Sequence, residues 1–397
     1  MNIKTDYNHT VYASYIGYIT QAVVNNFAPL LFLTFSRQFG LSLDKITLIT
    51  SINFAVQLAV DLISAKFIDK IGYRVSVVLA HILSSLGLAG LAVLPGMMKN
   101  SYAGILASVV LYAVGGGLLE VMISPIVEAC PTQKKEAAMS LLHSFYCWGH
   151  VGVVLVSALF FRVCGIEHWR ILAALWAVIP LVNVFYFSQV PLYSITQDRE
   201  PISLGKLFGN RMFRLFMVLM VCAGASEQAM SQWASAFAEA ALGVPKTAGD
   251  LAGPCTFAAL MGTARLLYGK FGEKLALKKA MTLCAVLCVG AYLTATLTKS
   301  PAAGFVGCGI CGFSVGIFWP GTFSLAASEI KGAGTAMFAF MALAGDAGCS
   351  AGPALVGLVS GAAGDNLKTG LLAAVVFPLI ILVGSLCLKK DGNDNIQ

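Results

Sequence analysis

Charged residues are scarce in this sequence, since Asp, Glu, Lys and Arg together make up only 11% of its 397 residues. A soluble domain carries about 25% charged residues, so this composition excludes an ordinary water-exposed globular fold. Hydrophobic residues make up 58% of the chain, and its mean hydropathy is +0.80. This balance is typical of an integral membrane protein whose helices lie largely in lipid.

Motifs for catalysis and metal binding are also missing. The sequence contains no HExxH, and no Lys-Ser or Lys-Thr pair follows the glycine triplet at residues 115–117. The 11 cysteines fall mostly within apolar segments, without the spacing of a zinc site or a disulfide framework. We therefore expect no enzymatic activity, no metal and no cofactor.

Long apolar runs fill the chain, and its polar start, MNIKTDYNHT, does not resemble a cleavable signal peptide. A helix needs about 20 apolar residues to cross a bilayer, so the chain has room for roughly twelve spans. The sequence therefore predicts an all-α integral membrane protein with twelve transmembrane helices. Their predicted ranges are 10–36, 44–67, 73–96, 101–128, 136–163, 168–190, 211–238, 247–271, 275–298, 301–327, 333–361 and 366–389.

One long polar connection divides the predicted helices into two sets of six. It covers residues 191–210 and separates an N-terminal bundle, 1–190, from a C-terminal bundle, 211–397. We expect this connection to be a cytosolic linker, with residues 202–208 lying on the membrane surface. Glycines four residues apart, at 312 and 316 and at 348 and 352, predict close contacts between helices.

The basic residues predict the orientation of the chain. With both termini in the cytosol, most of the 26 Lys and Arg residues fall in cytosolic segments, as the positive-inside rule requires. The net charge of +7 therefore reflects these loops, and we expect no binding of nucleic acid, because no basic patch is interleaved with exposed aromatics. The predicted location is the cytoplasmic (inner) membrane, and the predicted state is a monomer.

Polar residues at four-residue spacing interrupt the apolar pattern of the second predicted helix. Asn53, Gln57 and Asp61 share one face of that helix because four residues make about one turn. A carboxylate at this depth is costly in hydrocarbon, so Asp61 should face protein or a water-filled cavity. An alternative interpretation is a structural role in which Asp61 caps the basic loop or pairs with Arg265.

The charged loop after this helix resembles the signature loop of the major facilitator superfamily. Residues 65–74, AKFIDKIGYR, match that pattern at Asp69, Lys70, Gly72 and Arg74, and residues 265–274, RLLYGKFGEK, form a second, weaker copy. Two copies in equivalent halves indicate a duplicated transporter of two pseudo-symmetric six-helix bundles. The resemblance implies that these residues, with Arg265, form a gate rather than bind substrate.

Four acids lie within apolar helices and are the candidates for proton coupling. They are Asp61, Glu120, Glu227 and Asp346. Intramembrane acids commonly mark substrate or proton pathways, although Asp61 and Asp346 could instead stabilise helix packing. His143 and His150 share a helix face with Cys147 between them, an arrangement that suits either a proton relay or ordinary interior packing.

Residues 116–157 resemble the fourth and fifth helices of the fucose/glucose/galactose–proton symporter family. The matching segments are Gly-Gly-Leu-Leu-Glu at 116–120, Lys-Lys at 134–135, and Leu-Leu-His-Ser-Phe at 141–145. The resemblance implies that Glu120 takes part in proton coupling. The acid that this family carries in its first helix has no match here, because Asn25 and Asn26 occupy that region.

Helices 1, 4, 7 and 10 line the central cavity in transporters of this fold, so the resemblance places polar residues of these helices together. The expected cavity residues are Gln21, Asn25, Asn26, Glu120, Glu227, Gln228, Gln232, Trp233 and Trp319. Amides and carboxylates beside an indole suit hydroxyl-rich solutes, and also other polar organic molecules.

The sequence thus predicts a secondary active transporter that moves a small polar organic solute, with sugar-like compounds favoured, by alternating access and proton-coupled symport. Its expected partners are this solute, protons or another coupling cation, and the lipid bilayer. One alternative is a proton antiporter that exports amphipathic or drug-like compounds. Another is a receptor-like membrane protein that does not transport.

The orientation can be tested with reporter fusions. A reporter fused after Asp198 or at Gln397 should be active in the cytosol, and one at Lys99 should be active outside. The reason is the bias of basic residues toward the predicted cytosolic loops. External activity from the fusion at Gln397 would contradict an even number of spans with both ends inside.

Overall fold

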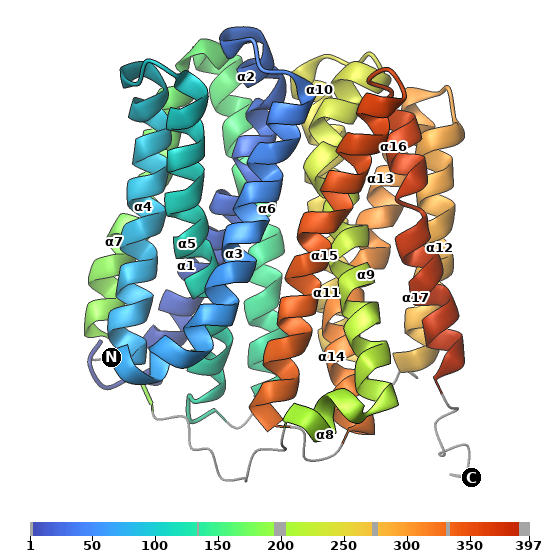
Figure 1. The fold of residues 1–397 in the computed structure, drawn as a ribbon. Coiled ribbons are helices and arrows are strands. Elements are labelled where there is room, and N and C mark those ends of the chain that lie inside the picture. The colour runs from blue at the N-terminus through green and yellow to red at the C-terminus, as the bar shows by residue number, and fades with distance from the viewer. Residues whose placement is uncertain (1–2, 133–134, 194–203, 272–276, 331–333, 389–397) are drawn as a thin grey trace.

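Long helices running side by side make up the whole fold (Figure 1). The structure is a computed structural model that describes residues 3–132, 135–193, 204–271, 277–330 and 334–388. No strand occurs in these ranges. Helix α1 begins and helix α17 ends at the same end of the bundle (Figure 1). We call this the terminal end, and the opposite one the distal end.

The first half of the chain forms the helices that Figure 1 draws in blue to green. Their bounds are α1 (Tyr7–Asn26), η1 (Ala28–Leu31), α2 (Phe32–Phe39), α3 (Leu43–Ile71), α4 (Tyr73–Met97), α5 (Ser101–Glu128), α6 (Lys135–Cys164), η2 (Ile166–His168) and α7 (Trp169–Gln189). Asp6 and Asn100 cap the starts of α1 and α5 by accepting hydrogen bonds from backbone N–H groups.

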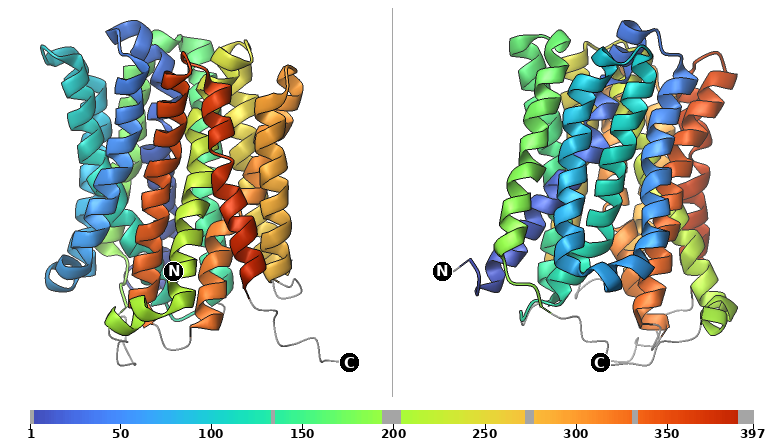
Figure 2. Two further views of the ribbon diagram at one scale, coloured as in Figure 1. Left: turned by 45° about the vertical axis from the view of Figure 1, so that its right-hand side comes forward. Right: turned by 60° about the vertical axis from the view of Figure 1, so that its left-hand side comes forward.

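The second half forms the helices that Figure 2 draws in yellow-green to red. Their bounds are α8 (Leu204–Gly209), α9 (Arg211–Ala236), η3 (Phe237–Ala241), α10 (Lys246–Asp250), η4 (Leu251–Cys255), α11 (Thr256–Phe271), α12 (Leu277–Leu297), α13 (Pro301–Val315), α14 (Phe318–Glu329), α15 (Gly334–Ala362), α16 (Leu367–Ala373) and α17 (Val376–Cys387). The short helix α8 belongs to the predicted surface segment 202–208, of which residues 202–203 lie outside the described ranges.

Eleven of the described helical runs are long and apolar enough to cross a membrane. A further run consists of the consecutive elements α10, η4 and α11, in which a π-helical segment containing Pro254 interrupts the α-helix. It carries Arg265 within its α11 part. The predicted all-helical membrane fold is confirmed, and the eighth predicted helix corresponds to this interrupted run.

Three further predicted helices are interrupted rather than continuous. The first breaks into α1, η1 and α2 around Pro29, because proline cannot donate the backbone hydrogen bond that an α-helix needs. The tenth breaks between α13 and α14 at residues 316–317, and the twelfth between α16 and α17 at residues 374–375. The hydropathy pattern located these helices but carried no signal for the breaks.

The two halves meet along two pairs of helices. Helix α3 packs against α15, and α6 packs against α11; the first pair lies side by side at the centre of Figure 1. At the distal end, an Arg37 guanidinium nitrogen lies 2.6 Å from a Glu239 carboxylate oxygen. The rings of Phe32 and Trp233 also approach each other, with centroids 6.0 Å apart. These contacts join the halves on the distal side of the molecular centre.

Glycines allow the closest approaches between helices, as their spacing predicted. A Cβ atom at Gly348 would overlap the Val221 carbonyl oxygen of α9, and one at Gly352 would be 2.5 Å from the Ala225 carbonyl oxygen. The same holds for Gly312 against the Phe257 carbonyl oxygen of α11. In lipid, where apolar surface gives little drive for association, such backbone contact is a main source of helix packing.

This packing predicts the effect of one added methyl group. We expect Gly348→Ala to lower the thermal stability of the purified protein, because overpacking of this kind costs about 1–3 kcal/mol. The matched control is Gly290→Ala in α12, where an added Cβ meets nothing within 4 Å. Thermal unfolding in detergent measures both; equal melting temperatures for the two variants would contradict the packing argument.

Candidate substrate cavity

A cavity lies between the two halves of the bundle. Residues of both halves line it, from helices α1, α3, α5 and α6 on one side and α9, α11, α14 and α15 on the other. The lining residues are Tyr18, Gln21, Asn25, Phe54, Glu120, His143, Tyr146, Glu227, Gln228, Arg265, Trp319, Asp346 and Cys349. Six of the nine residues predicted for the cavity belong to this set: Gln21, Asn25, Glu120, Glu227, Gln228 and Trp319.

The polar stripe of α3 holds a cavity residue in place. The Asn25 Oδ1 atom accepts hydrogen bonds from Asn53 Nδ2, at 3.1 Å, and from Gln57 Nε2, at 2.8 Å. All three side chains are buried. Two donors on one oxygen fix the orientation of the Asn25 amide, so its Nδ2 group is directed away from α3. Asn53 and Gln57 therefore position the site without lining it.

Glu120 of α5 is bound to an amide of α1. Gln21 Nε2 donates to Glu120 Oε2 over 2.7 Å, a short distance for an N–H donor. The Gln21 Oε1 atom is buried and accepts no hydrogen bond from the described residues. A buried, unused acceptor is costly, so this atom is suited to receive a donor from a bound molecule. Gln21 thus binds the Glu120 carboxyl group through Nε2 and leaves its Oε1 atom available to a donor of a bound molecule.

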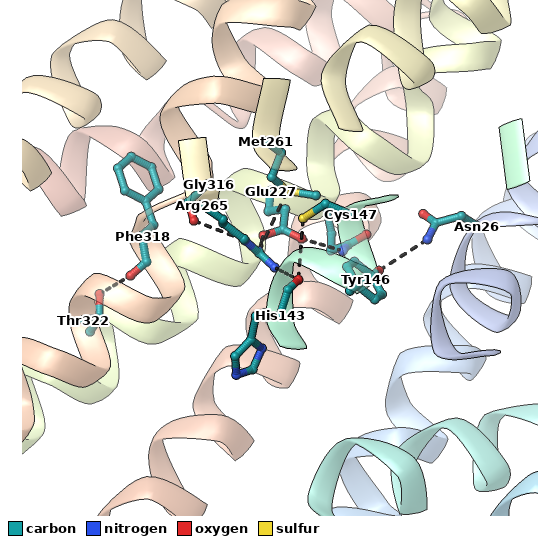
Figure 3. Close-up of polar contacts among 11 residues, drawn as sticks. Asn26, His143, Tyr146, Cys147, Glu227, Met261, Arg265, Gly316, Phe318 and Thr322 are labelled. Atoms are coloured by element: carbon teal, nitrogen blue, oxygen red, sulfur yellow. Dashed lines mark hydrogen bonds and ion pairs between the residues drawn. The ribbon is translucent and has the colours of Figure 1, made fainter. Parts of the chain in front are cut away.

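Arg265 of α11 forms the central ion pair of the cavity. Its guanidinium lies 3.2 Å from Glu227 Oε2, and it also donates to the backbone oxygens of Gly316, at 3.2 Å, and His143, at 3.4 Å (Figure 3). The interpretation that Asp61 pairs with Arg265 is therefore wrong, because Glu227 is the acid that reaches this guanidinium. Since His143 belongs to α6, Arg265 also joins the two halves.

A chain of amides extends from Glu227 toward the first half. Gln228 Nε2 donates to Glu227 Oε1 at 3.4 Å, and Gln232 Nε2 donates both to Gln228 Oε1 and to the Asn25 backbone oxygen, at 3.0 and 3.2 Å. Gln232 is outside the lining and supports Gln228 from behind. The hydrogen bond between Gln228 and Gln232 shows that they share one face of α9.

Two other predicted cavity residues pack away from the lining. Asn26 donates to the Ala22 backbone oxygen of its own helix at 2.9 Å and to the Tyr146 hydroxyl at 3.4 Å. The Trp233 indole donates to the Pro353 backbone oxygen at 3.0 Å and is 1% exposed. Trp233 therefore joins α9 to α15, and the indole that lines the cavity is that of Trp319.

The remaining two predicted acids lie beside each other. Asp346 of α15 lines the cavity and is 3% exposed. Its carboxyl group lies within hydrogen-bonding reach of Glu120 on one side and Asp61 on the other. Asp61 does not line the cavity, and its two carboxylate oxygens are buried. The structure thus brings three of the four acids into one connected group.

Several lining residues were missed as cavity residues by the sequence. Tyr18, Phe54, Tyr146 and Cys349 line the cavity, and the Tyr18 hydroxyl lies 2.9 Å from Ser124 Oγ. Tyr18 could have been found, because it precedes Gln21 by three residues and so shares its helix face. The others look like ordinary apolar positions. Their position in the cavity depends on how the helices are rotated.

The residues of the predicted gate loop are described only in part. Gly72 has φ +88°, a conformation that favours glycine, and it ends α3 before the turn into α4. Arg74 donates to the backbone oxygens of Phe187, Ser188 and Val190 at the end of α7. This contact stays within the first half. The side chains of Asp69 and Lys70, and all of Gly272, lie outside the described residues.

Comparisons with solved structures agree on the fold. A crystal structure of the E. coli fucose:proton symporter FucP superposes with a TM-score of 0.69 and 16% sequence identity, over 96% of this chain and 98% of that one. A FucP structure in the outward conformation gives a TM-score of 0.68 and 16% identity, over 95% and 97% of the two chains. At this identity the likeness shows the fold alone.

Comparisons of sequence show the family. No curated protein matches the chain. The family profile described as "Major Facilitator Superfamily", however, matches residues 14–353, which is most of its length. The chain is therefore a multi-pass membrane protein that belongs to the major facilitator superfamily.

Proposed function

We propose that this protein is a proton-coupled secondary transporter that moves a small, hydroxyl-rich organic solute, such as a sugar, by alternating access. The single observation that carries the proposal is the hydrogen bond between Gln21 and Glu120 in a cavity between the halves. It links a group that can bind a proton to an amide that can bind a solute. The protein acts from the cytoplasmic membrane, with both termini inside.

The lining favours a neutral polar solute. Gln21, Asn25 and Gln228 provide amide groups that both donate and accept hydrogen bonds, as alternating hydroxyl groups require. The Trp319 indole offers an apolar face against which the C–H surface of a sugar ring can pack. The cation of the cavity, Arg265, already faces the carboxylate of Glu227, so the lining does not present an uncompensated positive charge to an anion.

Charge pairing distinguishes the two candidate acids for coupling. Glu227 has a guanidinium partner at 3.2 Å, so its negative charge is compensated where it lies. The hydrogen bond that Glu120 accepts comes from a neutral amide, and its other close neighbour is the acid Asp346. A carboxylate without a cationic partner in this environment is the better proton carrier. We therefore assign the coupling proton to Glu120.

The same hydrogen bond suggests how proton and solute are linked. An ionised Glu120 only accepts hydrogen bonds, and it holds the Gln21 amide through Nε2. Protonation turns one carboxyl oxygen into a donor, which releases or turns the amide. The position of Gln21 Oε1, the acceptor available to the solute, therefore changes when Glu120 is protonated. Domains that rock around this fixed site then carry solute and proton across together.

Replacement of Glu120 by Gln tests the assignment. The amide keeps the shape of the side chain but cannot release a proton, so uptake driven by a pH gradient should fall to background. Exchange of labelled for unlabelled solute should persist, because the loaded carrier can still change conformation. The solute for these assays is the one that most raises the melting temperature in a screen of sugars, amino acids, nucleosides and organic acids.

The matched control is Glu128→Gln, which removes an exposed acid from the last residue of the same helix. It should leave both activities unchanged in proteoliposomes. Full gradient-driven uptake by Glu120→Gln would refute the assignment of the coupling proton. Solute binding without translocation by the unmodified protein would instead favour a receptor-like role, and efflux coupled to inward proton flow would favour an exporter.

The ion pair gives a separate prediction about stability. We expect Glu227→Gln to lower the melting temperature, because removing one partner of a buried ion pair costs about 3–5 kcal/mol. The double variant Glu227→Gln with Arg265→Met should recover part of this loss, since it leaves no buried charge unpaired. Thermal unfolding of the single and double variants measures the difference. A double variant less stable than both single variants would contradict the pairing.

A further inference from the structure

Two carboxyl groups from opposite halves of the molecule meet beside the cavity, where Asp346 belongs to the lining and Asp61 does not. Asp61 lies on α3 and Asp346 on α15, the helix pair along which the halves pack. Their carboxyl groups lie within hydrogen-bonding reach of each other. Both oxygens of Asp61 and the Oδ2 atom of Asp346 are buried and accept no hydrogen bond from any described N–H or O–H donor.

Such a contact needs a proton. Ionised carboxylates only accept hydrogen bonds, so two of them cannot bond to each other, and in a poorly hydrated interface their charges repel. One shared proton converts one carboxyl into a donor and removes half of the charge. Paired carboxyl groups that hold a single proton between them are a known arrangement at like-charged sites.

A neighbouring amide supplies an independent sign of a missing donor. Gln57 lies one turn before Asp61 on the same face of α3, and helical side chains lean toward the N-terminus, so Asp61 leans toward Gln57. The Gln57 side chain is 1% exposed, and its Oε1 atom also has no donor among the described residues. Gln57 Oε1, one helical turn from Asp61, is thus a further buried acceptor that lacks a donor.

The groups around Asp61 and Asp346 include no cation that would compensate the charge of these two carboxyl groups among the described residues. Glu120 of α5 adds a third acid, and Tyr18 of α1 and Cys349 of α15 lie near Asp346. Beyond them, His143 of α6 lines the cavity, and Arg265 of α11 faces Glu227 of α9. The described residues also contain no cluster of three or more His, Cys, Asp or Glu side chains arranged to hold a metal ion.

We propose that Asp61 and Asp346 share one proton between α3 and α15, forming a second proton-binding site where the two halves of the molecule meet. This site is distinct from the Gln21–Glu120 pair that the proposed function uses. It makes the approach of α3 and α15 dependent on a bound proton. Loss of this proton leaves two facing charges that drive the helices apart, so the site acts on the opening of the interface rather than on the solute.

Infrared difference spectroscopy tests the site without any solute. The full chain, reconstituted in lipid and labelled with carboxyl-¹³C aspartate, is compared at low and high pH. We expect one protonated carboxyl absorption that carries the aspartate isotope shift and is lost at high pH. Asp61→Asn and Asp346→Asn should each remove or displace this absorption, because the two side chains share its proton.

Two controls separate this site from others. Asp44→Asn, which removes an exposed acid in the first turn of the same helix, should leave the absorption unchanged. Glu120→Gln should also leave an aspartate absorption in place, so the proposed coupling role of Glu120 can fail without affecting this result. Asp61→Glu checks folding: it keeps a carboxyl group opposite Asp346 and should retain a protonated carboxyl absorption that is lost at high pH.

The contrary outcomes are equally definite. An aspartate absorption that neither Asn variant alters would overturn the proposal, as would its absence from the unmodified protein at all pH values. Loss of the absorption when sodium chloride replaces choline chloride at constant pH would assign the pair to a sodium ion instead. A monodisperse Asp61→Glu protein with no protonated carboxyl absorption at this position would also contradict a shared proton.

Discussion

The need to compensate charge inside the membrane governs the arrangement of this protein. Arg265 is the clearest case, because the residue is 8% exposed and its guanidinium is held by Glu227 and by two backbone oxygens. One of these oxygens belongs to α6 in the other half of the chain. A buried cation is stable only if such partners stay in place. The orientation of α9, α11 and α6 at the cavity is therefore coupled to a single side chain.

The amide groups at the centre extend this constraint to the remaining helices. Asn25 accepts hydrogen bonds from α3 through its side chain and from α9 through its backbone oxygen. One residue of α1 is thus held by both halves at once. A rocking motion of the halves must break or rearrange the bond from Gln232. The contacts at the distal end, including that of Arg37 with Glu239, depend on the same relative position.

Tight helix packing explains why these polar groups can meet at all. Gly348 and Gly352 let α15 approach the backbone of α9, and the α15 position then brings Asp346 toward α5 and α3. Ionised acids that meet at this depth in a membrane are costly unless they share protons or find cations. Close packing of α15 is therefore what brings these acids together.

The sequence by itself determined the membrane class, the position of nearly every helix, and which residues are too polar for lipid. Those features follow from local composition and from helical periodicity, which act within one segment of chain. It also identified Gln21, Asn25, Glu120, Glu227, Gln228 and Trp319 as residues for the cavity. Only the tertiary structure decided that Arg265 pairs with Glu227 rather than Asp61, that Trp233 packs against Pro353, and that Asp61 meets Asp346. These choices depend on the rotation and depth of helices distant in sequence, which no local pattern encodes.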